Sequence, residues 1–142
     1  MSDVVFPRSP KEIMAGWAYL PRLVDKIRLH LAGRLHPDYQ ANFLYKGCDK
    51  LWFERSGVRP EELVEVVRRS VTDGEVCDWV LANTRATEAE KAAHRDHLFN
   101  HGRGGDPALR ERLEMRKQQS GLGHRTDIET FVDYIDADER RS

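Results

Sequence analysis

The chain has 142 residues, and its 23 lysines and arginines are balanced by 24 aspartates and glutamates, so the formal net charge is −1 at pH 7. This length predicts one domain, residues 1–142, with a single core that needs no disulfide or structural metal. The charge balance gives no overall field that would favour nucleic acid or a membrane surface. No apolar run approaches the roughly 20 residues that span a bilayer, and residues 1–8 are predicted to be an N-terminal arm rather than a leader, so we expect a cytoplasmic protein.

Helix start and stop signals begin early in the chain. Ser9, Pro10 and Glu12 have the spacing of a capping box with proline at the first helical position, and they predict a short helix that ends near Gly16. A second helix is predicted over residues 20–33, because apolar residues recur at helical spacing and Gly33 provides a left-handed stop. Its apolar side consists of Leu20, Leu23, Val24, Ile27 and Leu31.

The stretch 34–48 is the least regular part of the chain. A turn is expected at His36-Pro37-Asp38, and Gly47 is a further break. Long connections of this kind often carry functional residues. Asp49 is predicted to cap a short helix that Gly57 ends, and Pro60 is predicted to begin the next helix.

Three further capping boxes follow, and the overall pattern is helical. They are Thr72 with Glu75, Thr87 with Glu90, and Thr126 with Glu129. Asp106-Pro107 begins a polar helix that we expect on the surface. No segment alternates with period two, so the sequence predicts an all-α, compact single-domain bundle of about six to eight short helices and no β-sheet. Residues 137–142 are expected to be a frayed tail.

One crowded, charged face is the main candidate for a site. Its candidate ligand-binding residues are Trp17, Tyr19, Arg22, Asp25, Lys26 and Arg28. Arginine, lysine and aromatic side chains at helical spacing suit a small anionic or zwitterionic ligand, or a protein partner. The other interpretation is a structural salt-bridge network between this helix and the acidic C-terminal helix, with Asp133, Asp136 and Asp138 as partners.

An enzyme is the alternative class of function. It would use the same charged face with a nearby histidine, His30 or His36, with or without a divalent metal. No motif nominates a catalytic nucleophile, and the spacing of Cys48 and Cys77 predicts neither a redox pair nor a disulfide framework. We therefore favour binding over catalysis.

Three histidines form a weak candidate metal site. His94, His97 and His101 follow one another at i, i+3 and i+7, so they share a helical face. They span about 10 Å, which is long for one tetrahedral ion. The other interpretation is a half-buried helix face, and no cofactor is expected. Nucleic-acid binding is not favoured, and nothing in the sequence predicts a particular oligomeric state.

Two segments carry a resemblance to a known family. They are residues 7–33, with the run GWAYLPRLVDKIR, and residues 126–139, TDIETFVDYIDADE. The chain resembles the bacterial domain-of-unknown-function family 5069, and the resemblance implies a small helical domain without an assigned activity. Members of that family usually have glycine where this chain has Arg140, and aromatic residues near His94 and His97. These departures count against a histidine metal site shared by the family.

Overall fold

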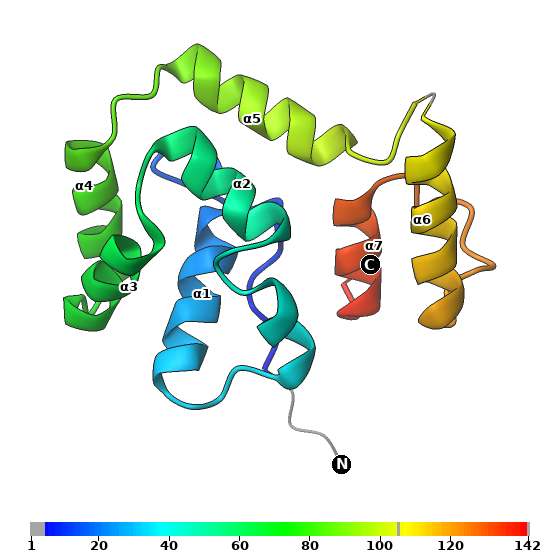
Figure 1. The fold of residues 1–142 in the computed structure, drawn as a ribbon, viewed down its shortest axis with the longest axis horizontal. Coiled ribbons are helices and arrows are strands. Elements are labelled where there is room, and N and C mark those ends of the chain that lie inside the picture. The colour runs from blue at the N-terminus through cyan, green and yellow to red at the C-terminus, as the bar shows by residue number, and fades with distance from the viewer. Residues whose placement is uncertain (1–4, 105, 142) are drawn as a thin grey trace.

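A computed structural model describes residues 5–104 and 106–141, and helices account for most of them (Figure 1). The elements are β1 (Ile13–Met14), β2 (Trp17–Ala18), α1 (Leu20–Leu31), the 3₁₀ helix η1 (Pro37–Asn42), α2 (Gly47–Ser56), α3 (Pro60–Arg69), α4 (Asp73–Asn83), α5 (Glu88–Asn100), α6 (Pro107–Gln119) and α7 (Phe131–Asp138). The predicted all-α class is confirmed. None of the described helices has the length and apolar character needed to cross a membrane.

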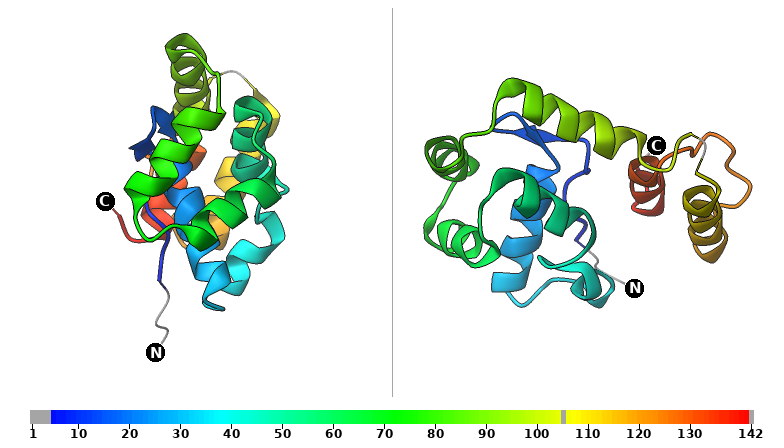
Figure 2. Two further views of the ribbon diagram at one scale, coloured as in Figure 1. Left: turned by 90° about the vertical axis from the view of Figure 1, so that its left-hand side faces the viewer. Right: turned by 45° about the horizontal axis from the view of Figure 1, so that its top comes forward.

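The helices form two groups that α5 connects. Figure 1 shows α1 to α4 on one side, α6 and α7 on the other, and α5 running across the top between them. The second view in Figure 2 keeps α6 and α7 at the opposite end from α3 and α4. The first group holds most of the apolar core, because α1 packs on α3 and α5 packs on β2.

The predicted short helix after Ser9 and the predicted absence of β-sheet are wrong. Ser9 begins a turn, and β1 and β2 then pair antiparallel, with Met14 opposite Trp17. Ala15 and Gly16 both have positive φ, 54° and 80°, which matches the left-handed backbone of a two-residue type I′ turn. The hairpin forms because it places Trp17 and Ala18, which are adjacent in sequence, fully inside the core.

Trp17 lies at the centre of the core. Its ring meets Trp52 edge to face at 5.9 Å and His94 at 5.5 Å, and Lys91 Nζ lies 5.8 Å from its centroid. Such aromatic pairs contribute about 1 kcal/mol each beyond the area they bury. Trp17 therefore joins the hairpin to α2 and α5.

The predicted helix boundaries are partly right. Thr72 and Thr87 each form the expected capping box, and Gly57 ends α2 with φ of 79°. The box at Thr126 is wrong, because α7 begins later and Thr130 is the residue whose hydroxyl accepts the N–H of Asp133. A threonine followed three residues later by a glutamate is a short pattern that also occurs by chance. Thr130, which directly precedes α7, is fully buried.

Residues 139–141 of the predicted frayed tail are held against the first segments of the chain. Glu139 is 6% exposed and Arg141 donates to the carbonyl of Pro7 and to Glu139. The prediction was wrong because the carboxylate of Glu139 has a buried partner more than 100 residues away. Arg140 has φ of 65°, in the left-handed region that glycine adopts at less cost.

Candidate functional site

The charged face predicted on residues 20–33 is divided between two environments. Arg22 and Lys26, one turn apart on α1, are 3% and 5% exposed and line a cleft. Asp25 and Arg28 do not line this cleft and have partners elsewhere. Tyr19 joins the first set, whereas Trp17 lies in the core.

The second set is a structural cluster. Asp25 accepts two hydrogen bonds from the Arg8 guanidinium, at 2.9 and 3.0 Å, and a third from its backbone N–H. Asp73 binds Arg8 at 2.8 Å and Arg28 at 2.6 Å. Burial alone would raise the pKa of Asp73, but these two arginines outweigh it and hold the pKa below its usual value. This cluster joins the N-terminal arm to α1 and α4.

The cleft lies between α1, η1 and the start of α2 on one side and α6 and α7 on the other, with a volume of about 620 Å³. Its side chains are charged and aromatic. The lining used below consists of Tyr19, Arg22, Lys26, His36, Asp38, Tyr39, Lys46, Gly47, Cys48, Asp49, Arg112, Arg116, Asp138 and Glu139. Ligand sites commonly have volumes of about 300 to 1,000 Å³.

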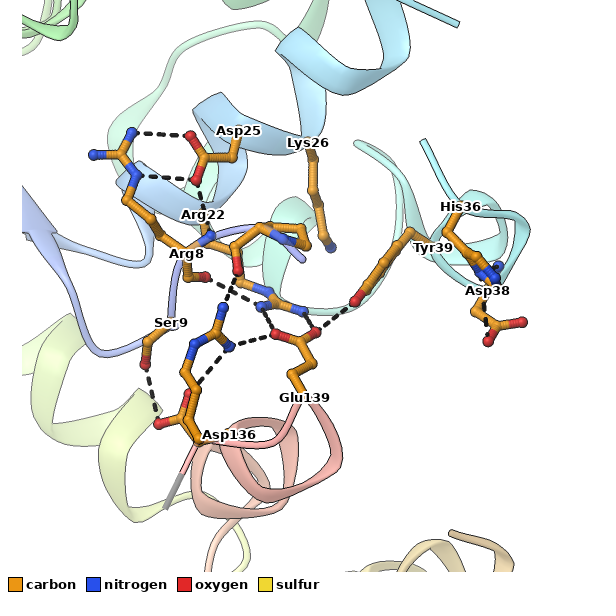
Figure 3. Close-up of polar contacts among 12 residues, drawn as sticks. Arg8, Ser9, Arg22, Asp25, Lys26, His36, Asp38, Tyr39, Asp136 and Glu139 are labelled. Atoms are coloured by element: carbon orange, nitrogen blue, oxygen red, sulfur yellow. Dashed lines mark hydrogen bonds and ion pairs between the residues drawn. The ribbon is translucent and has the colours of Figure 1, made fainter. Parts of the chain in front are cut away.

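Arg22 and Glu139 both line this cleft and form an ion pair (Figure 3). Two parallel hydrogen bonds of 2.8 and 2.6 Å join the guanidinium to the carboxylate, and Tyr39 donates to the same carboxylate at 2.6 Å. Burial would raise the pKa of Glu139, but Arg22 and Tyr39 together keep it below its usual value. Glu139 is therefore ionised at neutral pH, and α7 is fastened to α1.

A buried triad forms a second part of the cleft wall. Tyr19 donates to Asp49 at 2.5 Å, and Lys26 Nζ lies 3.1 Å from both the tyrosine oxygen and the carboxylate. The other oxygen of Asp49 accepts the N–H of Leu44. Burial, with the charge of Asp49, raises the pKa of Tyr19 well above its usual value, so the phenol stays protonated. Asp49 is thus a buried counter-ion and not the cap of α2.

Two residues that donate hydrogen bonds to Asp49 have unusual backbone conformations. Tyr19, at the start of α1, has φ of 80°, and Leu44 has φ of 66°. Left-handed backbone costs a non-glycine residue of order 1–3 kcal/mol and persists only where surrounding contacts require it. Here the hydrogen bonds that Tyr19 and Leu44 donate to Asp49 hold both residues in this conformation.

Three cations of the cleft have no acidic partner in the described part of the chain. Lys46, Arg112 and Arg116 are exposed, and within the described residues no carboxylate lies within 4.0 Å of their charged nitrogens. Arg112 and Arg116 are one helical turn apart on α6, so both side chains lie on the cleft side. The cleft also holds two exposed carboxylates, Asp38 and Asp138.

Cys48 lines the cleft but is not suited to nucleophilic chemistry. Burial and the neighbouring charge of Asp49 raise the pKa of its thiol. The reactive form of cysteine is the thiolate, so this thiol is largely unreactive at neutral pH. Cys77 is also free and lies elsewhere.

The three candidate metal-binding histidines are divided between two environments. Nε2 of His94 lies 3.3 Å from the carbonyl oxygen of Ala18, and its ring packs on Trp17. His97 stacks on His101 at 5.6 Å, and His101 in turn meets Phe131. Across residues 5–104 and 106–141, no group of three His, Cys, Asp or Glu side chains is arranged to hold a metal ion.

The two histidines named with the enzyme alternative also separate. His36 lines the cleft, where its Nδ1 accepts the N–H of Asp38. The ring of His30 packs at a tilt against that of Phe43, with centroids 4.7 Å apart, and His30 does not line the cleft. The enzyme alternative needs a histidine that lines the cleft, and of His30 and His36 only His36 does so.

Sequence reasoning missed much of the cleft. Tyr39, Lys46 and Cys48 lie in the irregular stretch 34–48, where the sequence predicts functional residues but singles out only His36. Arg112 and Arg116 lie on a helix that was interpreted only as polar surface. Their i, i+4 spacing was a signal, but nothing local shows that this side of the helix faces α1.

Fold and site together define a small helical protein with a charged, aromatic cleft. The family model for a domain of unknown function (DUF5069) matches residues 4–141. The chain therefore belongs to this family, as the resemblance predicted. No curated protein shows significant sequence similarity to the chain.

Proposed function

We propose that the protein is a binding module and that its cleft receives a small molecule with an anionic group. The observation that supports this most directly is the convergence of Lys46, Arg112 and Arg116, without acidic partners among the described residues, on one cleft. Like charges brought together repel one another, and a bound anion would relieve that repulsion. The ion pairs with Arg8 and Asp73 explain the positions of Asp25 and Arg28 as structural. They do not explain why these three cations lie together in the cleft.

The rest of the lining fits the body of such a ligand. Tyr39 offers an aromatic surface, and the exposed carboxylates of Asp38 and Asp138 suit hydroxyl or amino groups. A zwitterionic or polyhydroxylated molecule with one anionic end matches both features. The cytoplasmic location and the absence of a nucleic-acid partner stay predictions.

An enzyme has weaker support in this cleft. The thiol of Cys48 and the phenol of Tyr19 both have raised pKa values, because both are buried, and so neither is an activated nucleophile at neutral pH. His36 and His101 also line the cleft and are the remaining candidates for proton transfer. We therefore place binding first.

The test is a thermal-shift and calorimetric titration with inorganic phosphate and citrate, at constant ionic strength set with sodium chloride. We expect a rise in Tm with at least one of the two anions and an affinity at least tenfold lower after Arg112→Ala with Arg116→Ala. Arg110→Ala is the matched control, because Arg110 is exposed on the same helix and does not line the cleft. Equal affinity in the double variant and the wild type would overturn the proposal.

A further inference from the structure

We infer that α6 and α7 form a flap that closes the cleft on a bound anion, so that anion binding and the docking of α7 on the rest of the chain strengthen each other. The flap is defined as residues 106–141. This inference rests on the proposed function and adds how that site is regulated. Figures 1 and 2 show α7 between α6 and the group of helices that contains α1 and α2.

The flap has buried apolar side chains of its own. Leu113 and Ile128 are 0% and 3% exposed, yet neither belongs to the main core. Inside the flap, α6 packs on α7, and the hydroxyl oxygens of Ser120 and Tyr134 lie 2.6 Å apart. Among the described residues of the flap, Val132 is the one that the main core includes. Apolar packing therefore joins the flap to the rest of the chain over a small area, at the start of α7.

The flap is anchored at that same point. The backbone N–H of Phe131, the first residue of α7, donates to the carbonyl of His101 at 3.0 Å. Its ring packs closely on Gly102, where a Cβ would lie 3.1 Å from it. Gly102 has φ of 101°, which favours glycine over other residues. The segment that follows α5 is therefore the pivot of the flap, and motion about it is greatest at the far end of α7.

Away from the pivot, polar contacts hold α7 on the first group of helices. They join Lys11 with Asp133, Ser9 with Asp136, and Arg22 with Glu139, of which the last two are drawn in Figure 3. Deleting one partner of a buried ion pair is costly, but separating the two charges into water costs much less, because both are then hydrated. Polar interfaces of this kind permit relative motion of the parts that they join. The flap can therefore open without losing a large apolar contact.

The proposed anion site is divided between the two parts. Lys46 lies at the start of α2, whereas Arg112 and Arg116 belong to the flap, and all three line the cleft. Like charges on the two parts repel each other and favour an open cleft. An anion between them attracts both parts, so it binds the closed arrangement more tightly and shifts the flap toward it. By linkage, firmer docking of α7 also raises the affinity for the anion.

The first experiment loosens the flap from outside the cleft. Lys11 does not line the cleft, and Lys11→Glu places a negative charge beside Asp133 and Asp136. Arg69→Glu makes the same change in net charge on an exposed position of α3, and it is the control. In calorimetric titrations with phosphate and citrate at constant ionic strength, Lys11→Glu should weaken binding by about threefold or more. Arg69→Glu should bind like the wild type.

Hydrogen exchange measures the motion itself. Saturating anion should slow the exchange of the backbone amides of α7 by about threefold or more and leave those of α3 unchanged. Lys11→Glu should speed the exchange of α7 without anion, again with α3 unchanged, which shows that the variant is folded. The double variant Arg112→Ala with Arg116→Ala should lose the effect of the anion on α7.

These measurements separate the two proposals. If an anion binds the wild type but the exchange of α7 does not change, or if Lys11→Glu binds that anion as tightly as the wild type does, the flap is wrong and the proposed function stands. Failure of every anion to bind the wild type would overturn both.

Discussion

His94 illustrates how one buried side chain adapts to its surroundings. A carbonyl oxygen only accepts hydrogen bonds, so the contact with Ala18 means that Nε2 carries the ring proton. Nδ1 is buried and has no hydrogen-bond partner among the residues that the structure describes. Burial lowers the pKa of His94, because a second proton would place a charge beside Trp17 with no acceptor.

This environment predicts a pH dependence of stability. An unfolded histidine titrates near pH 6.5, and the folded pKa of His94 is lower, so protons bind the unfolded state first as the pH falls. The stability that neutral His94 contributes is fully present above about pH 6.5, the pKa of an unfolded histidine. It is lost as the pH falls from there to the lower pKa that His94 has in the folded protein. Urea unfolding between pH 7.5 and 5 should show this loss in the wild type.

The His94→Phe variant should show a smaller loss over the same range, because the aromatic ring is kept and the titrating group is removed. Part of the slope should persist, since burial also lowers the pKa of His101. Substitution of the exposed His124 by glutamine is the control and should leave the slope unchanged. Identical pH profiles for His94→Phe and the wild type would contradict this assignment.

At the scale of elements, α7 depends on a cap that the sequence pattern did not identify. The helix has eight residues, and isolated helices of that length are unstable in water. Thr130 is fully buried and its hydroxyl accepts the N–H of Asp133. Thr126, which was predicted to cap this helix, is exposed and makes no side-chain hydrogen bond among the described residues.

The two threonines should therefore respond differently to the same change. Thr130→Ala should reduce the free energy of unfolding by about 1–2 kcal/mol, because an N-cap hydrogen bond is lost. Thr126→Ala should stay within about 0.5 kcal/mol of the wild type, as surface substitutions usually do. Chemical denaturation of both variants tests this, and a larger effect at Thr126 would show that α7 begins earlier.

At the scale of the whole molecule, polar pairs fasten α7 to segments at the other end of the sequence. Arg22 pairs with Glu139, Lys11 pairs with Asp133 at 2.7 Å, and the hydroxyl of Ser9 donates to Asp136. The Arg22–Glu139 pair is buried, whereas Lys11 is 43% exposed, so solvent screens the second pair more strongly. The buried pair therefore has the larger effect on how firmly α7 is held against α1.

Removing one charge from the buried pair should be costly. Glu139→Gln leaves Arg22 buried without its counter-ion, and we expect a loss of about 3 kcal/mol or more. Asp25→Ala should cost about 1 kcal/mol, because its pair with Arg8 is partly exposed, at 22% and 32%. The double change Arg22→Met with Glu139→Met should cost less than Glu139→Gln. Urea denaturation provides the measurement, and equal costs for Asp25→Ala and Glu139→Gln would contradict it.

The sequence by itself determined the helical class, most helix boundaries and the family. Helix boundaries follow from hydrogen bonds between residues only a few positions apart in the sequence. Examples are the capping boxes at Thr72 and Thr87 and the end of α2 at Gly57. It also identified the charged segment that holds Arg22 and Lys26.

Only the tertiary structure decided which charges meet. The C-terminal segment offers four acidic residues as partners for Arg22: Asp133, Asp136, Asp138 and Glu139. Arg22 pairs with Glu139 because of the way α7 lies against α1. The same arrangement turned Asp25 and Arg28 away from the cleft and brought Arg112 and Arg116 to it. Coulomb attraction depends on distance in space and not on separation in sequence, so a pattern of charges along the chain leaves their partners undetermined.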